Sequence, residues 1–454
     1  MTALQQYIDL FNDNRGAFAK HSPAALTVLR DKALAALDGS VLPQSGQEDY
    51  EATDLESVFA PDYGVNLNRV DFQADPNYTF HCDVPNMSTC LYFFYNDIMR
   101  RSRTASANVG KVVVESFSEA QQHHPGILTQ YLGSIAHLDK PEVALNSLLA
   151  EDGMLVYVPD GVVAEKPIQL VNIYNAAAPV MAVRRILVVV GENASARMLV
   201  CDHAQAKDVD FLGSQVVEIV ALKNSTFDYY DMEETGSNVK RVSSVFVDQR
   251  EGSNVLVDGI TLVNGFTRND YCVEVNGEHA ETQLLGMTIA SGTQHVNNHT
   301  FIGHNAPRCH SNEMFKYVLN DQSVGAFSGK ILVQPHCPRI EAYQGNRNIV
   351  STPTAKMFTK PQLEIYTDDV KCSHGSAIGQ LDEDALFYMR TRGISEEEAR
   401  MLLMQAFMSD VIDAVRMDSL KDRLHHLVEK RFKGQLAMCS ECGSVQCNSK
   451  LEKQ

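Results

Sequence analysis

The 454-residue sequence has no tryptophan, no long apolar run and a shortage of basic residues. Tryptophan offers the largest aromatic surface for stacking on a sugar ring, so its absence counts against a carbohydrate-active enzyme. The longest aliphatic runs, such as residues 186–190, fall far short of the roughly 20 apolar residues that span a bilayer. With 39 basic against 57 acidic residues, the net charge of -18 repels phosphate backbones and anionic lipids. We therefore expect neither a nucleic-acid nor a membrane partner, and a protein or a cation fits better.

The start of the sequence also lacks the features of a secretory signal. The segment 1–21 carries Asp9 and Asp13 and has neither a basic n-region nor an apolar h-region. We expect a cytoplasmic protein, in which the ten cysteines stay reduced.

The length exceeds that of one compact core, and the pattern of the sequence divides it into three units. Residues 1–152 are mainly of helical period, with an irregular, turn-rich stretch in the middle. Residues 153–378 are rich in short β-branched runs, which predict strands. Residues 379–454 return to helical spacing and end in a tail that contains cysteines.

The strand-rich unit shows two superimposed periods. Turn signals recur about every 30 residues, and this is the spacing of successive coils in a β-solenoid. They lie at Glu192-Asn193, Asn224-Ser225, Ser253-Asn254, Asn276-Gly277 and His304-Asn305. Shorter turn intervals are present too, so a β-sandwich is the alternative. The pattern predicts a β-helix flanked by two helical domains.

The last unit contains clear signals for helix ends. Asp382 can cap one helix that stops at Gly393, and Ser395 with Glu398 can form a capping box for the next. That second helix has a wide apolar face, which is either intramolecular core or a docking surface for a partner. The face comprises Leu402, Leu403, Ala406, Phe407, Ile412 and Val415.

Catalytic motifs are missing. The segment Gly325–Lys330 resembles a phosphate loop, but it has three residues between its glycines where four are needed, and Ile331 stands where a Ser or Thr would hold magnesium. Any ATP hydrolysis that the protein depends on must come from another chain.

A cluster of potential ligands lies further along the strand-rich unit. It comprises His295, His299, His304, Cys309 and His310. Even spacing would place His295 with His299, and His304 with His310, on common strand faces. They are either hydrogen-bonded structural histidines or the lining of a route for metal or sulfur.

Two further groups of residues could bind metal. Cys372 and His374 are two apart in an expected strand and would share one face, and thiolate and imidazole are both ligands for iron. In the tail, Cys439, Cys442 and Cys447 form a C-x2-C-x4-C pattern, one ligand short of a closed zinc site. These three are either a metal site or reduced, unstructured thiols.

The surroundings of His374 resemble a known family. The segment 361–394 reads PQLEIYTDDVKCSHGSAIGQLDEDALFYMRTRGI and is similar to the segment that marks SufD proteins. Further similar segments are 311–320 (SNEMFKYVLN), 327–333 (FSGKILV) and 342–348 (AYQGNRN). SufB chains carry Cys-Glu-His-Glu where this sequence has Cys-Ser-His-Gly at 372–375, which favours SufD. The pair Ser376-Ala377 replaces the usual Ala-Thr.

The resemblance implies a right-handed parallel β-helix between helical domains, in a non-catalytic scaffold of iron-sulfur cluster assembly. It implies a SufB paralogue and a SufC ABC-type ATPase as partners, with a cysteine desulfurase system acting indirectly. His374 would lie near the SufB contact and take part in nascent cluster formation, with Cys372 secondary. No tightly bound cofactor is implied for the chain alone, but iron or a cluster would pass through the interface. The sequence leaves open whether the isolated chain forms a homodimer. The alternatives are a SufB-like scaffold and a carbohydrate-active β-helix enzyme.

Overall fold

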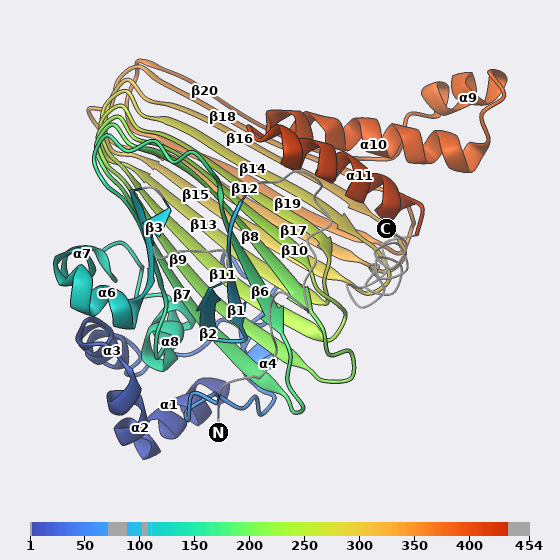
Figure 1. Cartoon of the computed structure of the whole chain (residues 1–454). Helices are drawn as coiled ribbons and strands as arrows, with labels where there is room; N and C mark the ends of the chain where they lie inside the picture. Colours follow the sequence, from blue (N-terminus) through green and yellow to red (C-terminus); the bar gives the residue numbers. More distant parts are fainter. Residues whose placement is uncertain (1, 71–88, 102–107, 110, 435–454) are drawn as a thin grey trace, which may run out of the picture.

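The computed structural model describes residues 2–70, 89–101, 108–109 and 111–434. A long stack of parallel strands forms the body, with one group of helices near the N-terminus and another near the C-terminus (Figure 1). The helices are α1 Ala3–Asp13, α2 Arg15–His21, α3 Ala24–Ala36, α4 Leu55–Phe59, α6 Phe117–His123, α7 Pro125–Tyr131, α8 Pro141–Leu149, α9 Glu383–Thr391, α10 Glu396–Ala414 and α11 Asp418–Phe432.

The strands are shorter and more numerous than the helices. They are β1 Cys90–Tyr95, β2 Ile98–Arg101, β3 Asn108–Val109, β4 Val112–Ser116, β5 Met154–Val158, β6 Ile168–Tyr174, β7 Val180–Val190, β8 Ser195–Ala204, β9 Phe211–Ala221, β10 Thr226–Glu234, β11 Val239–Gln249, β12 Asn254–Val263, β13 Phe266–Val275, β14 Glu281–Ala290, β15 His295–His304, β16 His310–Leu319, β17 Val324–Val333, β18 Ile340–Val350, β19 Lys356–Ile365 and β20 Val370–Gly379.

The strands form a β-solenoid. From β7 to β18, each strand pairs in parallel with the second strand before it and the second strand after it, so even-numbered and odd-numbered strands build two separate sheets. Residues 154–379 make about eight coils. Parallel pairing between successive coils excludes the antiparallel sandwich, and the β-helix prediction is confirmed.

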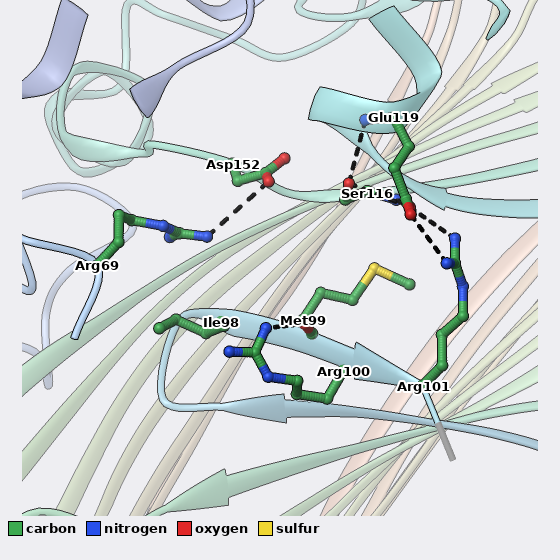
Figure 2. Close-up of a pocket in the computed structure, with 8 residues that line it drawn as sticks. All are labelled: Arg69, Ile98, Met99, Arg100, Arg101, Ser116, Glu119 and Asp152. Atoms are coloured by element: carbon green, nitrogen blue, oxygen red, sulfur yellow. Dashed lines mark hydrogen bonds and ion pairs between the residues drawn. The ribbon is translucent and has the colours of Figure 1, made fainter. Parts of the chain in front are cut away.

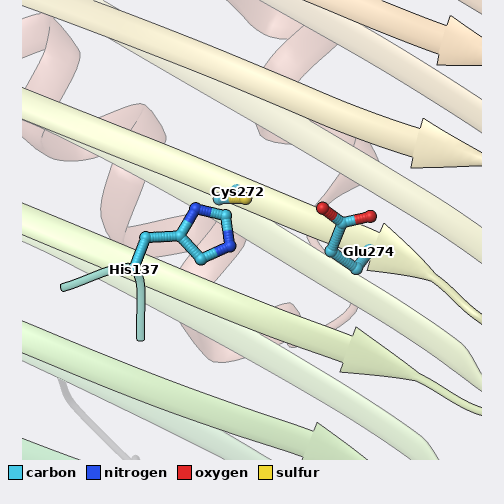
Figure 3. A group of neighbouring side chains, drawn as sticks. All are labelled: His137, Cys272 and Glu274. Carbon is cyan, nitrogen blue, oxygen red and sulfur yellow. The ribbon is translucent and has the colours of Figure 1, made fainter. Parts of the chain in front are cut away.

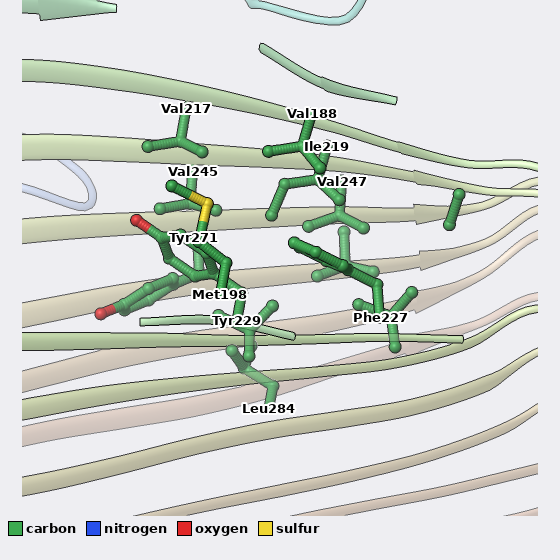
Figure 4. Packing of buried hydrophobic residues seen from close by; sticks show 14 of the residues in the cluster. Val188, Met198, Val217, Ile219, Phe227, Tyr229, Val245, Val247, Tyr271 and Leu284 are labelled. Carbon is green, nitrogen blue, oxygen red and sulfur yellow. The ribbon is translucent and has the colours of Figure 1, made fainter. Parts of the chain in front are cut away.

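Side chains at one level of each coil stack inside the solenoid. In the odd-numbered sheet, Ile219 pairs with Val247, Val247 with Val273, Val273 with Ile302 and Ile302 with Ile331. All five are buried, and several of them are seen packing together in Figure 4. Because each coil buries its inward side chains against the next, the apolar ladder stabilises the stack along its whole length.

The expected turns lie at the corners of the coils. Asn193 and Asn224 both adopt a positive φ of 55°, and the Asn224 side-chain amide donates to Asn193 Oδ1 at 3.1 Å. One coil further, Gly252 has φ 65°, and a Cβ there would lie 2.3 Å from Asn224 Oδ1. Asparagine and glycine tolerate the left-handed region, so these residues recur where the chain must turn.

Strands also occur in the stretch between residues 41 and 103, where the sequence pattern is irregular. β1 pairs in parallel with β6 and extends the even-numbered sheet, while β4 pairs antiparallel with β5 at the end of the other sheet. The N-terminal segment therefore contributes strands to both sheets as well as helices. Short strands at a sheet end carry too few residues to show a period.

The N-terminal helices cover the odd-numbered sheet. α8 is buried along its length, and Asn146 donates from its side-chain amide to Ser214 O at 3.0 Å. Arg185 donates to Ser147 Oγ at 2.6 Å and to Glu218 Oε1 at 2.7 Å, with no exposure of its guanidinium. These bonds join buried polar groups of the helix and the sheet and fix the helix in place.

The C-terminal helices pack on the even-numbered sheet. Asp382 caps α9, Ser395 accepts from the Glu398 N–H at the start of α10, and Gly393 has the expected positive φ of 87°. Met408, Val411, Ile412 and Val415 are buried against the sheet, while Leu402 stays 37% exposed. The expected apolar face is thus divided: Ile412 and Val415 are intramolecular core, Leu403 and Phe407 pack against that core while partly buried, and Leu402 and Ala406 are exposed. The N-terminal end of α10 extends away from the body together with α9 (Figure 1).

No helix in the described part of the chain is long and apolar enough to cross a membrane.

Candidate functional site at the open end of the solenoid

The last coil leaves two strand edges uncovered. β20 pairs only with β18 and ends one sheet, while β19 pairs only with β17 and ends the other, among the residues that the structure describes. Almost all of β20 is exposed. Open backbone edges readily accept a further strand, so this end has the form of an interface.

Cys372 and His374 lie on the inward face of β20. In the parallel register Cys372 is opposite Ala342 and His374 is opposite Gln344, both of which are buried inside the preceding coil. The expected common face of the pair is confirmed. Cys372 is half-buried at the edge of the core, where burial raises the pKa of its thiol, and His374 is exposed. An imidazole at the open end of the solenoid interior, the lumen, can reach a metal ion or cluster that a partner brings to it.

A polar group lies directly behind His374. Gln344 is 4% exposed, and its side-chain amide donates to Glu313 Oε2 at 2.9 Å, while Thr300 donates its hydroxyl to the other oxygen of Glu313. Burial raises the pKa of Glu313 to about 7. The Gln344 amide oxygen is buried without a partner among the described residues and is thus available to a donor from the next coil.

Polar side chains continue deeper into the lumen. Asn298 donates to Tyr317 Oη at 2.6 Å, Asn269 donates to Asn298 Oδ1 at 2.9 Å, and Arg241 donates to Asn269 Oδ1 at 2.9 Å. Arg241 also binds Asp202 at 2.8 Å and Asp231. The interior therefore holds a hydrogen-bonded column as well as an apolar one, and the column leads toward the open end.

Side chains of β18 and β19 hold β20 in place through hydrogen bonds. The Thr359 hydroxyl donates to Asn346 Oδ1 at 2.8 Å and lies 2.8 Å from the Ser376 hydroxyl. Asn348 donates to Ala377 O at 3.0 Å. These contacts set the position of the strand that carries His374, although no strand covers its outer edge.

The histidines of the predicted cluster make contacts with polar groups of neighbouring strands. His299 Nδ1 lies 3.0 Å from Asp270 Oδ1, and His304 Nε2 lies 2.9 Å from Ser311 Oγ. Burial lowers the pKa of both His295 and His304 to about 4, so both rings are neutral at physiological pH. His295 and His299 share β15, as expected, but His304 and His310 lie on different strands across a corner. Even spacing failed for that pair because the chain turns between them.

Two other features singled out in the sequence are the segment that resembles a phosphate loop and the three cysteines of the C-terminal tail. Residues 325–330 lie within β17, and Lys330 pairs with Glu364 at 2.6 Å. A phosphate loop needs a strand, a loop and a helix N-terminus, and that context is missing here. Cys439, Cys442 and Cys447 lie outside the described residues.

Two cavities in the described part of the chain are lined by residues other than Cys372 and His374. One, of about 340 Å³, is lined by arginines and acids near β2 (Figure 2). Arg101 pairs with Glu119 at 2.6 Å, and Arg69 pairs with Asp97 at 3.2 Å and lies 3.9 Å from Asp152. The guanidinium groups of Arg69 and Arg101 therefore already have carboxylate partners, which compensate their charge in this cavity.

Two family descriptions together match residues 1–170 and 172–407 of the chain. The family described as "SUF system FeS cluster assembly, SufBD core domain" matches residues 172–407, from the end of β6 to α10, and includes His374. The SufBD protein N-terminal region matches residues 1–170. The chain belongs to the SufBD family. SufBD membership accounts for the order of helical, solenoid and helical units, and it makes the chain a member of an iron-sulfur cluster assembly family.

Individual relatives of this SufBD chain agree with the family. An iron-sulfur cluster assembly SufBD family protein of Synechocystis is 27% identical over 419 residues, which cover 90% of this chain and 91% of the relative. Iron-sulfur cluster assembly protein SufD of Escherichia coli is 31% identical over 184 residues, 40% of this chain and 44% of the relative. Chloroplastic protein ABCI7 of Arabidopsis thaliana is 28% identical over 63% of this chain and 62% of its own length.

Sequence reasoning found His374 and Cys372 but missed the residues behind them. Gln344 and Glu313 belong to strands of earlier coils. A glutamine or glutamate in a strand normally predicts a position on the solvent-exposed face. Only the parallel register brings them into line with His374.

Proposed function

We propose that this SufBD chain is a SufD-type scaffold subunit that takes part in cluster assembly at its open end, with His374 as the central residue. The observation that carries this proposal is the position of His374: exposed, on the inward face of an uncovered last strand. The chain itself turns over no substrate. Iron or a nascent cluster is cargo at the interface and is not a resident cofactor.

The local sequence favours SufD over SufB. The segment 372–375 reads Cys-Ser-His-Gly where SufB chains carry Cys-Glu-His-Glu, so the acidic residues that flank the histidine in SufB are absent. The match to SufD of Escherichia coli supports the same choice. A SufB-like scaffold is the second candidate. SufBD membership favours both over the carbohydrate-active enzyme.

The partner at the open end would be a SufB paralogue. Each sheet ends on a strand with an unpaired edge, and apolar side chains of the last coil, including Phe358 and Ile378, are exposed. A second solenoid can add strands to both edges and cover these side chains. His374 would then face the partner's residues across the joint.

The ATPase partner, of SufC type, would bind the C-terminal helices. Phe387 and Tyr388 on α9 and Leu402 on α10 are exposed apolar side chains on a part that extends away from the solenoid. ATP-driven movement of that partner would be transmitted through α10 and α11, which are packed on the even-numbered sheet. Sulfur would come indirectly from a cysteine desulfurase system, and the assembly would work in the cytoplasm.

Co-purification tests the proposal. The chain is expressed with a SufB-type and a SufC-type protein, and the purified material is analysed for all three chains, iron and acid-labile sulfide. We expect one complex that holds iron and sulfide, and a clear loss of both when this chain is omitted. Equal iron and sulfide without this chain would contradict the proposal. Cluster accumulation with this chain and SufC alone would indicate the SufB-like role.

A further inference from the structure

A second group of metal-ligating side chains lies far from His374, on the outer face of the odd-numbered sheet. His137, Cys272 and Glu274 each place a ligand atom so that all three atoms lie within 4.8 Å of one another. Figure 3 shows the His137 ring above Cys272 and beside Glu274 of β13. Cys272 and Glu274 are two apart in one strand and so project from the same face.

The loop that carries His137 is fixed to the sheet on both sides of this residue. Before it, the Gly133 N–H donates to Glu218 Oε1 at 3.0 Å, and after it Lys140 Nζ lies 3.5 Å from Asp270 Oδ1. The His137 ring also packs on Phe246, with 5.1 Å between centroids. The imidazole is therefore held over β13 before any ion arrives, which lowers the cost of binding.

The carboxylate of Glu274 is oriented as well. Asn305 donates from its amide to Glu274 Oε2 at 2.7 Å. The next strand has Gly303 at this level, and a Cβ on it would lie 2.4 Å from the same oxygen. The glycine leaves room for the carboxylate, and the asparagine sets its direction, as outer hydrogen bonds commonly do for metal ligands.

The three residues line a cavity of about 320 Å³, so the group can be reached. Arg250, which also lines it, is paired with Asp248 at 2.7 Å, and this pairing compensates its positive charge. Cys272 is 6% exposed and lies at the inner wall, while Glu274 and His137 are half-buried. A cation would enter from the solvent side and meet the thiol last.

We propose that His137, Cys272 and Glu274 form a binding site for a divalent transition-metal ion of the Fe²⁺ to Zn²⁺ series. One thiolate, one imidazole and one carboxylate suit these borderline ions and disfavour magnesium or calcium. Small rotations of the side chains would let one central ion lie at metal-ligand distances of roughly 2.0–2.3 Å from each of the three ligand atoms. Three protein ligands leave a fourth position open for water or for an acceptor, which is the arrangement of an exchange site.

The competing interpretation is purely structural. Cys272 also packs with Val143, Val216 and Phe246, and a buried cysteine often serves as a small apolar side chain. That interpretation gives His137 and Glu274 no shared role. It predicts that changing either one leaves metal binding by the chain unaltered.

Cobalt titration separates the two interpretations, because Co²⁺ occupies sites of this kind and gives a thiolate charge-transfer band. The full chain is used with Cys372, Cys439, Cys442 and Cys447 replaced by serine, so that no other suspected site contributes. We expect one Co²⁺ per chain with the thiolate band, and displacement of Co²⁺ by Zn²⁺. Cys272→Ala should abolish the band, and His137→Gln and Glu274→Gln should each weaken binding at least tenfold.

Matched variants test the assignment. Cys309→Ala removes another buried cysteine and His279→Gln an exposed histidine, and both should keep the band and the affinity. If circular dichroism shows that Cys272→Ala does not fold, Glu274→Gln decides alone. Absence of stoichiometric Co²⁺ binding, survival of the band in Cys272→Ala, or unchanged affinity in Glu274→Gln would overturn the site.

Discussion

Gln344 and His374 are register partners on the last two strands of the even-numbered sheet, and Gln344 is itself bound to the buried carboxyl group of Glu313 at 2.9 Å. An exposed imidazole thus stands at the end of an interior polar column. The amide oxygen of Gln344 is buried and has no partner in the described residues, so it is suited to accept from the His374 ring and orient it.

We predict that His374→Ala lowers the iron and sulfide recovered in the assembled complex several-fold, because the substitution removes a ligand at the interface. Its effect on stability should stay within about 1 kcal/mol, since the side chain is exposed. Cys372→Ala is the matched variant and should lower iron less. Melting temperature and iron content are measured on the same purified complexes.

A structural role for His374 gives the opposite order. The melting temperature would then fall first, and iron would fall only in proportion to lost protein. Normal iron content with a lowered melting temperature would contradict the functional assignment.

Glu313 should make stability depend on pH. Burial raises its pKa from the usual 4.5 to about 7, so the folded chain keeps a proton that the unfolded chain releases near its ordinary pKa. The free energy of unfolding contributed by Glu313 therefore falls as pH rises from about 4.5 to 7, by at most about 3 kcal/mol. Glu313→Gln stays neutral and should lose this dependence of stability on pH. The nearby groups His299 and Tyr317 are present in both proteins.

Urea unfolding at pH 5 and pH 8 measures the difference between wild type and Glu313→Gln. The variant should gain stability relative to wild type at pH 8 and gain little at pH 5. The exposed Glu251 serves as control, and Glu251→Gln should show no such difference. Equal pH profiles for wild type and Glu313→Gln would show that the carboxyl group is ionised in both states.

Arg241 is a buried, positively charged residue in the interior of the solenoid. Its guanidinium is 2% exposed and binds the carboxylates of Asp202 and Asp231. Arg241→Ala would leave Asp231 buried without its partner, while Asp202 keeps Arg184 at 2.9 Å, and we expect the free energy of unfolding to fall by about 3–5 kcal/mol. The control is Arg250→Ala, whose side chain is 53% exposed and should cost within about 0.5 kcal/mol. A loss below 1 kcal/mol for Arg241→Ala in urea unfolding would show that the column carries little stability.

The far end of the C-terminal helices should determine capture of the ATPase partner. Phe387→Asp combined with Leu402→Glu should abolish pull-down of a SufC-type protein, because both changes place charge on exposed apolar side chains while leaving the core of α10 intact. Val163→Asp alters an exposed apolar side chain elsewhere and should leave capture unchanged. If capture persists after deletion of residues 380–454, the docking surface lies on another part of the chain.

The prediction of the fold succeeded where a local signal repeats. Asn193, Asn224 and Gly252 mark successive corners because each needs a positive φ, so the coil period was visible without any structure. The helix ends at Asp382, Gly393 and Ser395 were visible for a similar reason, since capping depends on neighbouring residues. Strand β1 was missed because its place is set by pairing with β6, which is distant in sequence.

The sequence by itself determined the strand-rich unit with its recurring turns, the capped C-terminal helices and the common face of Cys372 and His374, because these follow from local periods, turns and caps. Only the tertiary structure decided which side chains from distant parts of the chain come together, at His374 and elsewhere. The parallel register between coils placed Gln344 and Glu313 next to His374, and the anchored loop carried His137 to Cys272 and Glu274. Such contacts join residues that are far apart along the chain, and no local pattern encodes the register that brings them together.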